Sequence, residues 1–221
     1  MAKVKMGKGG KGDSKKLYNF FVTSIVTFFG IGKIPIMRGT LGSFAALIII
    51  LLMFYQPHFT VKGDNVSYFN LGSGIIRPDL LPYIIILSAI IIHITGVYFS
   101  DIYSKRIGKK DPKEVVIDEV AGMFTSVALA IVIYALLLEF YYDSYVLYLM
   151  LAHYYFIALF ILFRVFDILK PWHVAKAEKL KGGEGIMWDD QVAAIYAVIS
   201  FYAIFHLLKY IGFLDQFVEM K

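Results

Sequence analysis

Long runs of uncharged, apolar residues dominate the pattern of this chain. A helix needs about 20 predominantly apolar residues to cross a bilayer, and several runs are close to this length. They are Leu80–Ser100, Val120–Leu138, Val146–Phe163, Gln191–Leu208 and the shorter Leu41–Tyr55. The pattern therefore predicts an all-α, polytopic membrane helical bundle with about five transmembrane helices.

The first apolar stretch, Leu17–Ile31, has a different character, since it is short and contains several hydroxyl side chains. It predicts an N-terminal interfacial or re-entrant helix, and the sequence leaves open whether residues 17–31 span the membrane. Residues 1–16 are rich in lysine, and we expect them to form a basic, flexible N-terminal tail against anionic lipid. Residues 17–221 are expected to form a single membrane-embedded domain.

Composition supports a membrane protein and narrows its chemistry. The 221 residues are 59% hydrophobic and 18% charged, whereas soluble domains have about 45–50% apolar and about 25% charged residues. The chain has no cysteine. This absence excludes disulfide scaffolds, thiolate metal sites and cysteine-nucleophile phosphatases.

The distribution of basic residues predicts the orientation of the spans. Five spans leave six flanking segments, and the first, third and fifth of these hold 18 of the 22 Lys and Arg residues. By the positive-inside rule these segments lie in the cytoplasm. The net charge of +5 is thus explained by topology and lipid contact, and no nucleic-acid partner is needed to account for it.

Acidic residues gather on the same predicted face. The five acids are Asp118, Glu119, Asp167, Asp189 and Asp190. Asp118, Glu119, Asp189 and Asp190 are predicted at the starts of two spans, where an acid can simply cap a helix. Asp167 falls late in another span and could pair with Arg164 or Lys170 at a spacing of three residues. Two acidic pairs and an intramembrane acid on one face nevertheless favour a site for Mg²⁺ and phosphate.

A glycine-rich stretch from Gly30 to Ser43 precedes an apolar run on the same side. Its glycines permit close approach of the backbone, and the free N–H groups at a helix start attract an anion. Its spacing matches neither a Walker A loop nor a dinucleotide fingerprint. Small residues in membrane helices also serve close helix packing, so the stretch alone is compatible with either role.

Three ordered motifs make the chain resemble the phosphatidylglycerophosphatase A family of bacterial membrane lipid phosphatases. The first is the Gly30–Ser43 stretch, which ends in Gly39-Thr40-Leu41-Gly42-Ser43. The second is Asp118-Glu119-Val120-Ala121-Gly122-Met123. The third runs from Phe163-Arg164 through Asp167 and Lys170-Pro171-Trp172 to Asp189-Asp190. The resemblance extends over residues 28–195. Arg38 stands where the family has a proline.

The resemblance implies Mg²⁺-dependent hydrolysis of phosphatidylglycerophosphate to phosphatidylglycerol and inorganic phosphate, at the cytoplasmic face of the inner membrane. The anionic phospholipid would be the partner in the membrane. We expect the five acids to be catalytic, with Glu119, Asp167, Asp189 and Asp190 as metal ligands and Asp118 as a ligand or an outer-shell residue. The expected phosphate- and substrate-binding residues are Lys33, Arg38, Gly39, Thr40, Gly42, Ser43, Arg164 and Lys170.

Some alternatives stay open on the sequence alone. A small cation- or proton-coupled membrane transporter could also use an acidic cluster, although its acids should lie near the middle of the membrane. For a phosphatase, the sequence permits direct attack by water or an aspartyl-phosphate intermediate. It leaves the number of metal ions, the acyl-chain preference and the oligomeric state undetermined.

Overall fold

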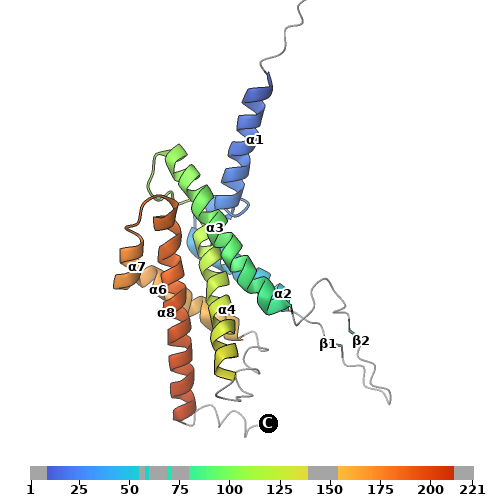
Figure 1. Cartoon of the computed structure of the whole chain (residues 1–221), viewed down its shortest axis with the longest axis vertical. Coiled ribbons are helices and arrows are strands. Elements are labelled where there is room, and N and C mark those ends of the chain that lie inside the picture. Colours follow the sequence, from blue (N-terminus) through green and yellow to red (C-terminus); the bar gives the residue numbers. More distant parts are fainter. Residues whose placement is uncertain (1–8, 55–57, 60–68, 71–79, 139–153, 212–221) are drawn as a thin grey trace, which may run out of the picture.

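The computed structural model describes residues 9–54, 58–59, 69–70, 80–138 and 154–211. Within these residues the chain is helical (Figure 1), as predicted, apart from a short antiparallel pair between β1 (His58–Phe59) and β2 (Phe69–Asn70). The helices are α1 (Gly9–Val26), the 3₁₀ turn η1 (Ile31–Lys33), α2 (Arg38–Phe54), α3 (Leu81–Ile107), α4 (Ile117–Leu138), α6 (Tyr154–Leu169), α7 (Trp172–Ala177) and α8 (Gly183–Tyr210).

Three of the described helices are long and apolar enough to cross a membrane. They are α3, the segment Ile117–Leu136 of α4, and α8. The predicted span Leu41–Tyr55 corresponds to α2, which is apolar but has only 17 residues. The predicted span Val146–Phe163 lies partly outside the described residues, and its remainder belongs to α6. The all-helical prediction is therefore confirmed, while the count of five spans stays a prediction.

Two helix boundaries differ from those predicted. Helix α1 begins at Gly9, so residues 9–16 of the predicted tail are helical. Once the apolar turns of a helix have formed, each further residue is added without a new nucleation step, which explains the extension. Residues 1–8 lie outside the described part of the chain.

Helix α8 likewise begins earlier than predicted, at Gly183 instead of Gln191. Glycine disfavours a helix interior, but tertiary contacts outweigh this preference here. The Cα atom of Gly183 packs against the backbone carbonyl of Val97 in α3, and that of Gly185 packs against the carbonyl of Leu180. As a consequence Asp189 and Asp190 lie inside a helix and do not cap one.

Helix α4 is the centre of the bundle, since it packs against α2, α3, α6 and α8. Its side chains Val120, Ala121, Met123 and Val127 are fully buried. Gly122 allows the closest approach, because a Cβ atom there would collide with the ring of Phe163 in α6 and contact Asp190 in α8. The burial of α4 therefore brings α6 and α8 against the helix that carries Asp118 and Glu119.

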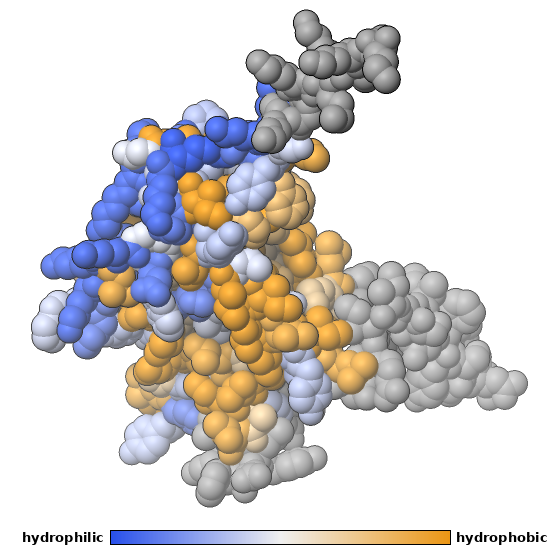
Figure 2. Space-filling view, turned by 45° about the horizontal axis from the view of Figure 1, so that its top comes forward, coloured by the Kyte–Doolittle hydropathy of each residue, from blue (hydrophilic) through white to orange (hydrophobic). Residues whose placement is uncertain are grey.

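The surface divides into a hydrophilic end and an apolar body. Figure 2 shows hydrophilic side chains gathered at one end of the molecule and hydrophobic ones over much of the rest of this face. On α3, for example, Leu87, Ile90, Ile91 and Ile94 are each more than half exposed. Exposed apolar residues on long apolar helices are typical of a lipid-facing surface. The structure thus agrees with a membrane protein.

Close packing of α3 on α8 gives a prediction for stability. Gly183→Ala should lower the free energy of unfolding by about 1–3 kcal/mol, because overpacking against a fixed backbone carbonyl forces the two helices apart. Gly96→Ala is the matched control on α3, where the new Cβ would meet the flexible end of Met187. Its loss should be smaller. Chemical denaturation of each detergent-solubilised variant, followed by circular dichroism, measures its free energy of unfolding. Equal losses of stability in the two variants would contradict the close packing of Gly183 on α3.

Candidate active site

A polar cleft opens between α4, α6 and α8, at the end where α4 and α8 begin and α6 ends. Its volume is about 600 Å³. The first turn of α2 and the loops before α4 and after α7 complete its walls. The lining residues are Pro35, Met37, Arg38, Lys110, Asp111, Lys113, Val115, Asp118, Glu119, Asp167, Lys170, Glu178, Gly182, Gly185, Ile186, Asp189 and Asp190.

All five acids predicted from the sequence line this cleft. Asp118 and Glu119 come from the first turn of α4, Asp167 from the last turn of α6, and Asp189 and Asp190 from α8. Asp189 is 7% exposed and Asp190 is 2% exposed. The acids thus converge from three helices, as the predicted topology required.

Three of these carboxylates lie close enough together to share a cation. One oxygen from each of Asp118, Glu119 and Asp190 lies within 4.8 Å of the other two. Each of the three also has a buried oxygen without a hydrogen-bond partner among the described residues. Buried anionic oxygens without partners are costly unless a cation or donor meets them. The donor set consists of carboxylate oxygens, which are the ligands of hard cations such as Mg²⁺.

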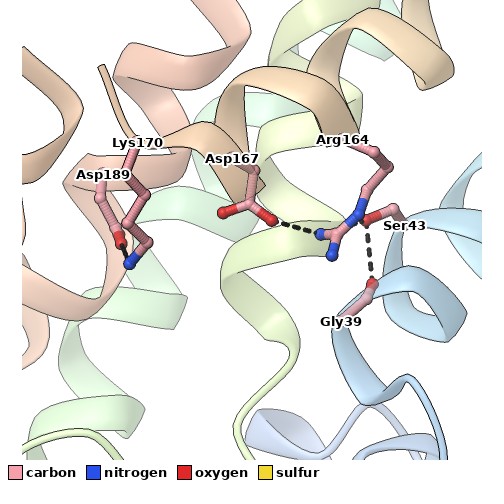
Figure 3. Close-up of polar contacts among 6 residues, drawn as sticks. All are labelled: Gly39, Ser43, Arg164, Asp167, Lys170 and Asp189. Carbon is pink, nitrogen blue, oxygen red and sulfur yellow. Dashed lines mark hydrogen bonds and ion pairs between the residues drawn. The ribbon is translucent and has the colours of Figure 1, made fainter.

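Asp167, which the sequence predicts as a metal ligand, has a cationic partner in the structure. Arg164 Nη1 lies 2.5 Å from Asp167 Oδ2, and both side chains are largely buried, with exposed fractions of 14% and 13%. The same guanidinium donates a hydrogen bond of 3.3 Å to Ser43 Oγ. Ser43 Oγ in turn donates to the Gly39 carbonyl at 3.0 Å. Figure 3 shows this chain of contacts from α6 to α2. Arg164 therefore holds Asp167 in place and links the two helices.

Asp189 also has a cationic partner, Lys170, on the other side of the cleft (Figure 3). Lys170 Nζ lies 3.1 Å from Asp189 Oδ2 and 3.1 Å from Glu178 Oε2. Partial burial alone would lower the pKa of Lys170, but the carboxylates of Asp189 and Glu178 outweigh it and raise the pKa above its ordinary value. Lys170 is thus a cation at neutral pH. The second oxygen of Asp189 is buried and has no partner among the described residues.

The backbone of Lys170 explains how its side chain reaches the cleft. Its φ angle is +43°, in the left-handed region that non-glycine residues rarely adopt. Its N–H group donates to the carbonyl of Phe166 at 2.9 Å, which closes the last turn of α6, and Pro171 prevents the helix from continuing. Strained backbone of this kind is common at functional sites.

The glycine-rich stretch packs against the acids more than it lines the cleft. Of its residues, Pro35, Met37 and Arg38 belong to the lining. Gly39 lies directly against the carboxylate of Glu119 and the guanidinium of Arg164, where a Cβ atom would collide. Gly42 is similarly packed against Val116. The structure thus favours close helix packing for these two glycines.

The other residues predicted to bind substrate are divided among the cleft, the packing between α2 and α6, and the exposed surface. Ser43 is buried and accepts the hydrogen bond from Arg164, and Thr40 lies with Gly39 in the first turn of α2. Lys33 is exposed at the end of η1 and does not belong to the lining of the cleft. Among the predicted cations, Arg38 and Lys170 are the two that line it.

Four charged residues of the cleft are not among those predicted from the sequence: Lys110, Asp111, Lys113 and Glu178. In the sequence, the basic residues of the loop before α4 indicate only the orientation of the spans. Lys110 and Lys113 lie only a few residues before Asp118, and this short spacing was the signal that could have identified them. Glu178 carries no comparable signal, because a contact with Lys170 across α7 depends on the fold.

Comparison with known proteins agrees with these motifs. The family model described as phosphatidylglycerophosphatase A matches residues 24–205. A protein of Bacteroides thetaiotaomicron, described as a candidate phosphatidylinositol-3-phosphatase, is 31% identical over 181 residues, which cover 82% of this chain and 91% of that protein.

Two further relatives are named phosphatidylglycerophosphatase A. The Escherichia coli protein is 28% identical over 180 residues, or 80% of each chain. The Haemophilus influenzae protein is 59% identical over 49 residues, which cover 22% of this chain and 30% of that protein. No solved structure is significantly similar to this chain.

The buried ion pair of Arg164 and Asp167 predicts that these two side chains stabilise the fold as a coupled pair. Arg164→Gln and Asp167→Asn should each lower the free energy of unfolding by about 3 kcal/mol, because each leaves one buried charge without its partner. The double variant should lose less than the sum of the two. A denaturant double-mutant cycle on the detergent-solubilised protein measures this coupling. Additive losses would show that the two side chains do not act as a pair.

Proposed function

Because this chain belongs to the phosphatidylglycerophosphatase A family, we propose that it hydrolyses the terminal phosphate of phosphatidylglycerophosphate. The products are phosphatidylglycerol and inorganic phosphate. The chain is a phosphatase of phospholipid metabolism. The observation that carries the proposed chemistry is the convergence of Asp118, Glu119 and Asp190 in one cleft with Lys170.

The proposed cofactor is Mg²⁺, held by Asp118, Glu119 and Asp190. Their unpartnered buried oxygens fit a hard divalent cation. A bound Mg²⁺ would polarise the phosphoryl group and activate a water molecule. Asp189 keeps one buried oxygen free beside its contact with Lys170 and is the candidate for a further ligand. Asp167, paired with Arg164, is a positioning residue in this arrangement.

The cations of the cleft make it able to receive an anionic substrate. The seven carboxylates that line the cleft would by themselves repel a phosphate monoester. Lys170 is partly buried and in contact with Asp189, and it would neutralise the equatorial oxygens of the transferring phosphoryl group. Arg38, Lys110 and Lys113 line the outer part of the cleft with exposed side chains. They would bind the second phosphate of the lipid headgroup.

The position of the cleft suits a lipid substrate. It lies at one end of the helices that are long enough to cross a membrane, where hydrophilic side chains gather (Figure 2). A headgroup can therefore enter while the acyl chains stay in the bilayer. The excess of Lys and Arg on this side supports the cytoplasmic face of the inner membrane. A transporter would place its acids near the middle of the membrane, and the family is one of enzymes.

Phosphate release tests the function directly. The detergent-purified protein should release phosphate from a short-chain phosphatidylglycerophosphate in the presence of Mg²⁺, and EDTA should abolish the release. Asp190→Asn should reduce kcat/KM about 100-fold or more, since even outer-shell partners of a metal ligand contribute about 10–100-fold. Asp13→Asn, an exposed acid on α1, is the matched control. Phosphatidylinositol 3-phosphate is the competing substrate, and faster turnover of it would overturn the proposed specificity.

Metal binding has a readout that does not depend on turnover. Addition of Mg²⁺ should raise the thermal unfolding midpoint of the wild-type protein, because a ligand that binds only the folded state stabilises it. The shift should disappear in Asp190→Asn and persist in Asp13→Asn. An equal shift in both variants would place the metal elsewhere.

Substrate recognition by the outer cations is tested by Lys113→Ala. Removal of one exposed cation should raise KM about two- to fivefold, as exposed ion pairs contribute about 0.2–1 kcal/mol, and should leave kcat nearly unchanged. Lys179→Ala, an exposed lysine outside the lining of the cleft, should leave both parameters unchanged. A fall in kcat for Lys113→Ala would instead indicate a contact with the reacting phosphate.

A further inference from the structure

A second groove runs along α3 and α8, lined by different residues from those of the cleft. It consists of two hollows that share Ile94. One hollow, of about 260 Å³, is apolar and lies between α3, α4 and α8. The other, of about 370 Å³, continues toward the start of α8 and is lined by polar side chains including Asp101, Lys181 and Glu184. An apolar trough that leads into a polar one has the shape of a phospholipid site.

An unpartnered amide points to a ligand in the apolar hollow. Gln191 lines it and is only 6% exposed. Its Oε1 accepts a hydrogen bond of 2.7 Å from Thr125 Oγ1, but its Nε2 is buried without a partner among the described residues. A buried donor without an acceptor costs about 1–3 kcal/mol. In a groove lined mainly by isoleucine, alanine, leucine and valine, a lipid ester carbonyl can supply the acceptor.

The depth of Gln191 agrees with such a carbonyl. Trp188 is 42% exposed and lies edge-on to His93, with ring centroids 5.0 Å apart. Exposed tryptophans of membrane helices concentrate at the level of the lipid headgroups. Gln191 lies three residues further along α8, which is about 4.5 Å deeper into the bilayer. That level is just below the headgroups, where the acyl esters begin.

The polar hollow carries charges of both signs. Lys181 is an exposed cation, and Glu184 and Asp101 are carboxylates, with Asp101 also paired to Lys105 at 2.6 Å. An anionic headgroup would satisfy Lys181 but would face both carboxylates without compensation. A headgroup with a phosphate and a primary ammonium complements both signs, since its N–H groups donate charge-assisted hydrogen bonds to carboxylates.

We propose that this groove binds one zwitterionic phospholipid with a primary-amine headgroup. One acyl chain lies between α3, α4 and α8, and its ester carbonyl accepts a hydrogen bond from Gln191 Nε2. The phosphate meets Lys181, and the ammonium meets Glu184 and Asp101. The site is separate from the substrate cleft, so the proposal does not depend on the proposed phosphatase activity.

Tryptophan fluorescence offers a direct test, because the chain has only two tryptophans. Trp172→Phe leaves Trp188, beside the groove, as the sole tryptophan, which can be excited selectively over the tyrosines. This full-length variant is reconstituted into phosphatidylcholine vesicles that contain small fractions of a lipid with brominated acyl chains, which quench tryptophan on contact. Brominated phosphatidylethanolamine should quench Trp188 with an apparent affinity about fivefold above that of brominated phosphatidylcholine, the effect of a single hydrogen bond to a charged group.

Variants of both ends of the groove complete the test. Ala89→Leu fills the apolar hollow, Gln191→Leu removes the donor, and Glu184→Gln removes an exposed carboxylate without disturbing the packing. Ala89→Leu and Gln191→Leu should weaken quenching by both lipids, because the acyl chain and its ester carbonyl are common to the two. Glu184→Gln should abolish the preference, whereas Ala203→Leu, on an exposed face of α8, should leave the affinity and the preference unchanged. Equal quenching by the two lipids, stronger quenching by brominated phosphatidylglycerol, or a preference that survives in Glu184→Gln would overturn the proposal. So would a cross-linked dimer in which a second copy covers Trp188.

Discussion

Electrostatic repulsion among the acids of the cleft is the constraint on which the rest of the structure depends. Five carboxylates from three helices line one cavity, and like charges at such distances destabilise the folded state unless cations compensate them. Asp167 and Asp189 have their own cations, Arg164 and Lys170. The remaining three turn oxygens toward one another and have buried atoms without partners among the described residues. The protein therefore compensates part of the charge internally and leaves the part that a divalent cation can neutralise.

Packing keeps this repulsive arrangement together. Gly39 and Gly122 allow α2, α6 and α8 to approach α4, because no side chain stands between the helices at these points. The contacts of Arg164 with Ser43 and Asp167 join α6 to α2. Since Val120, Ala121, Met123 and Val127 of α4 are fully buried, the free energy gained by that burial opposes the repulsion among the acids. The same close contacts bring the acids together in one cleft at the hydrophilic end of the molecule.

Helix α8 has two different faces in this phosphatase of phospholipid metabolism. Asp189 and Asp190 face the cleft, where the headgroup chemistry is proposed to occur. The next residue, Gln191, lies on the other side of the helix with Thr125 and the apolar groove, because successive residues of an α-helix point about 100° apart. One helix thus connects the proposed catalytic cleft with the apolar groove, and lipid bound in the groove would contact the helix that carries two of the acids.

The sequence by itself determined the all-helical class, the membrane character, the grouping of the acids at one end of the helices and the family, because apolar length, charge distribution and ordered motifs are all local features of the chain. It also allowed Asp167 to pair with either Arg164 or Lys170, and the tertiary structure decided for Arg164. Lys170 instead forms an ion pair with Asp189 of α8. The start of α8 at Gly183, the approach of Lys110 and Lys113, and the groove beside Gln191 were likewise decided only by the fold. Each depends on which helices pack together, and that information is not local in the sequence.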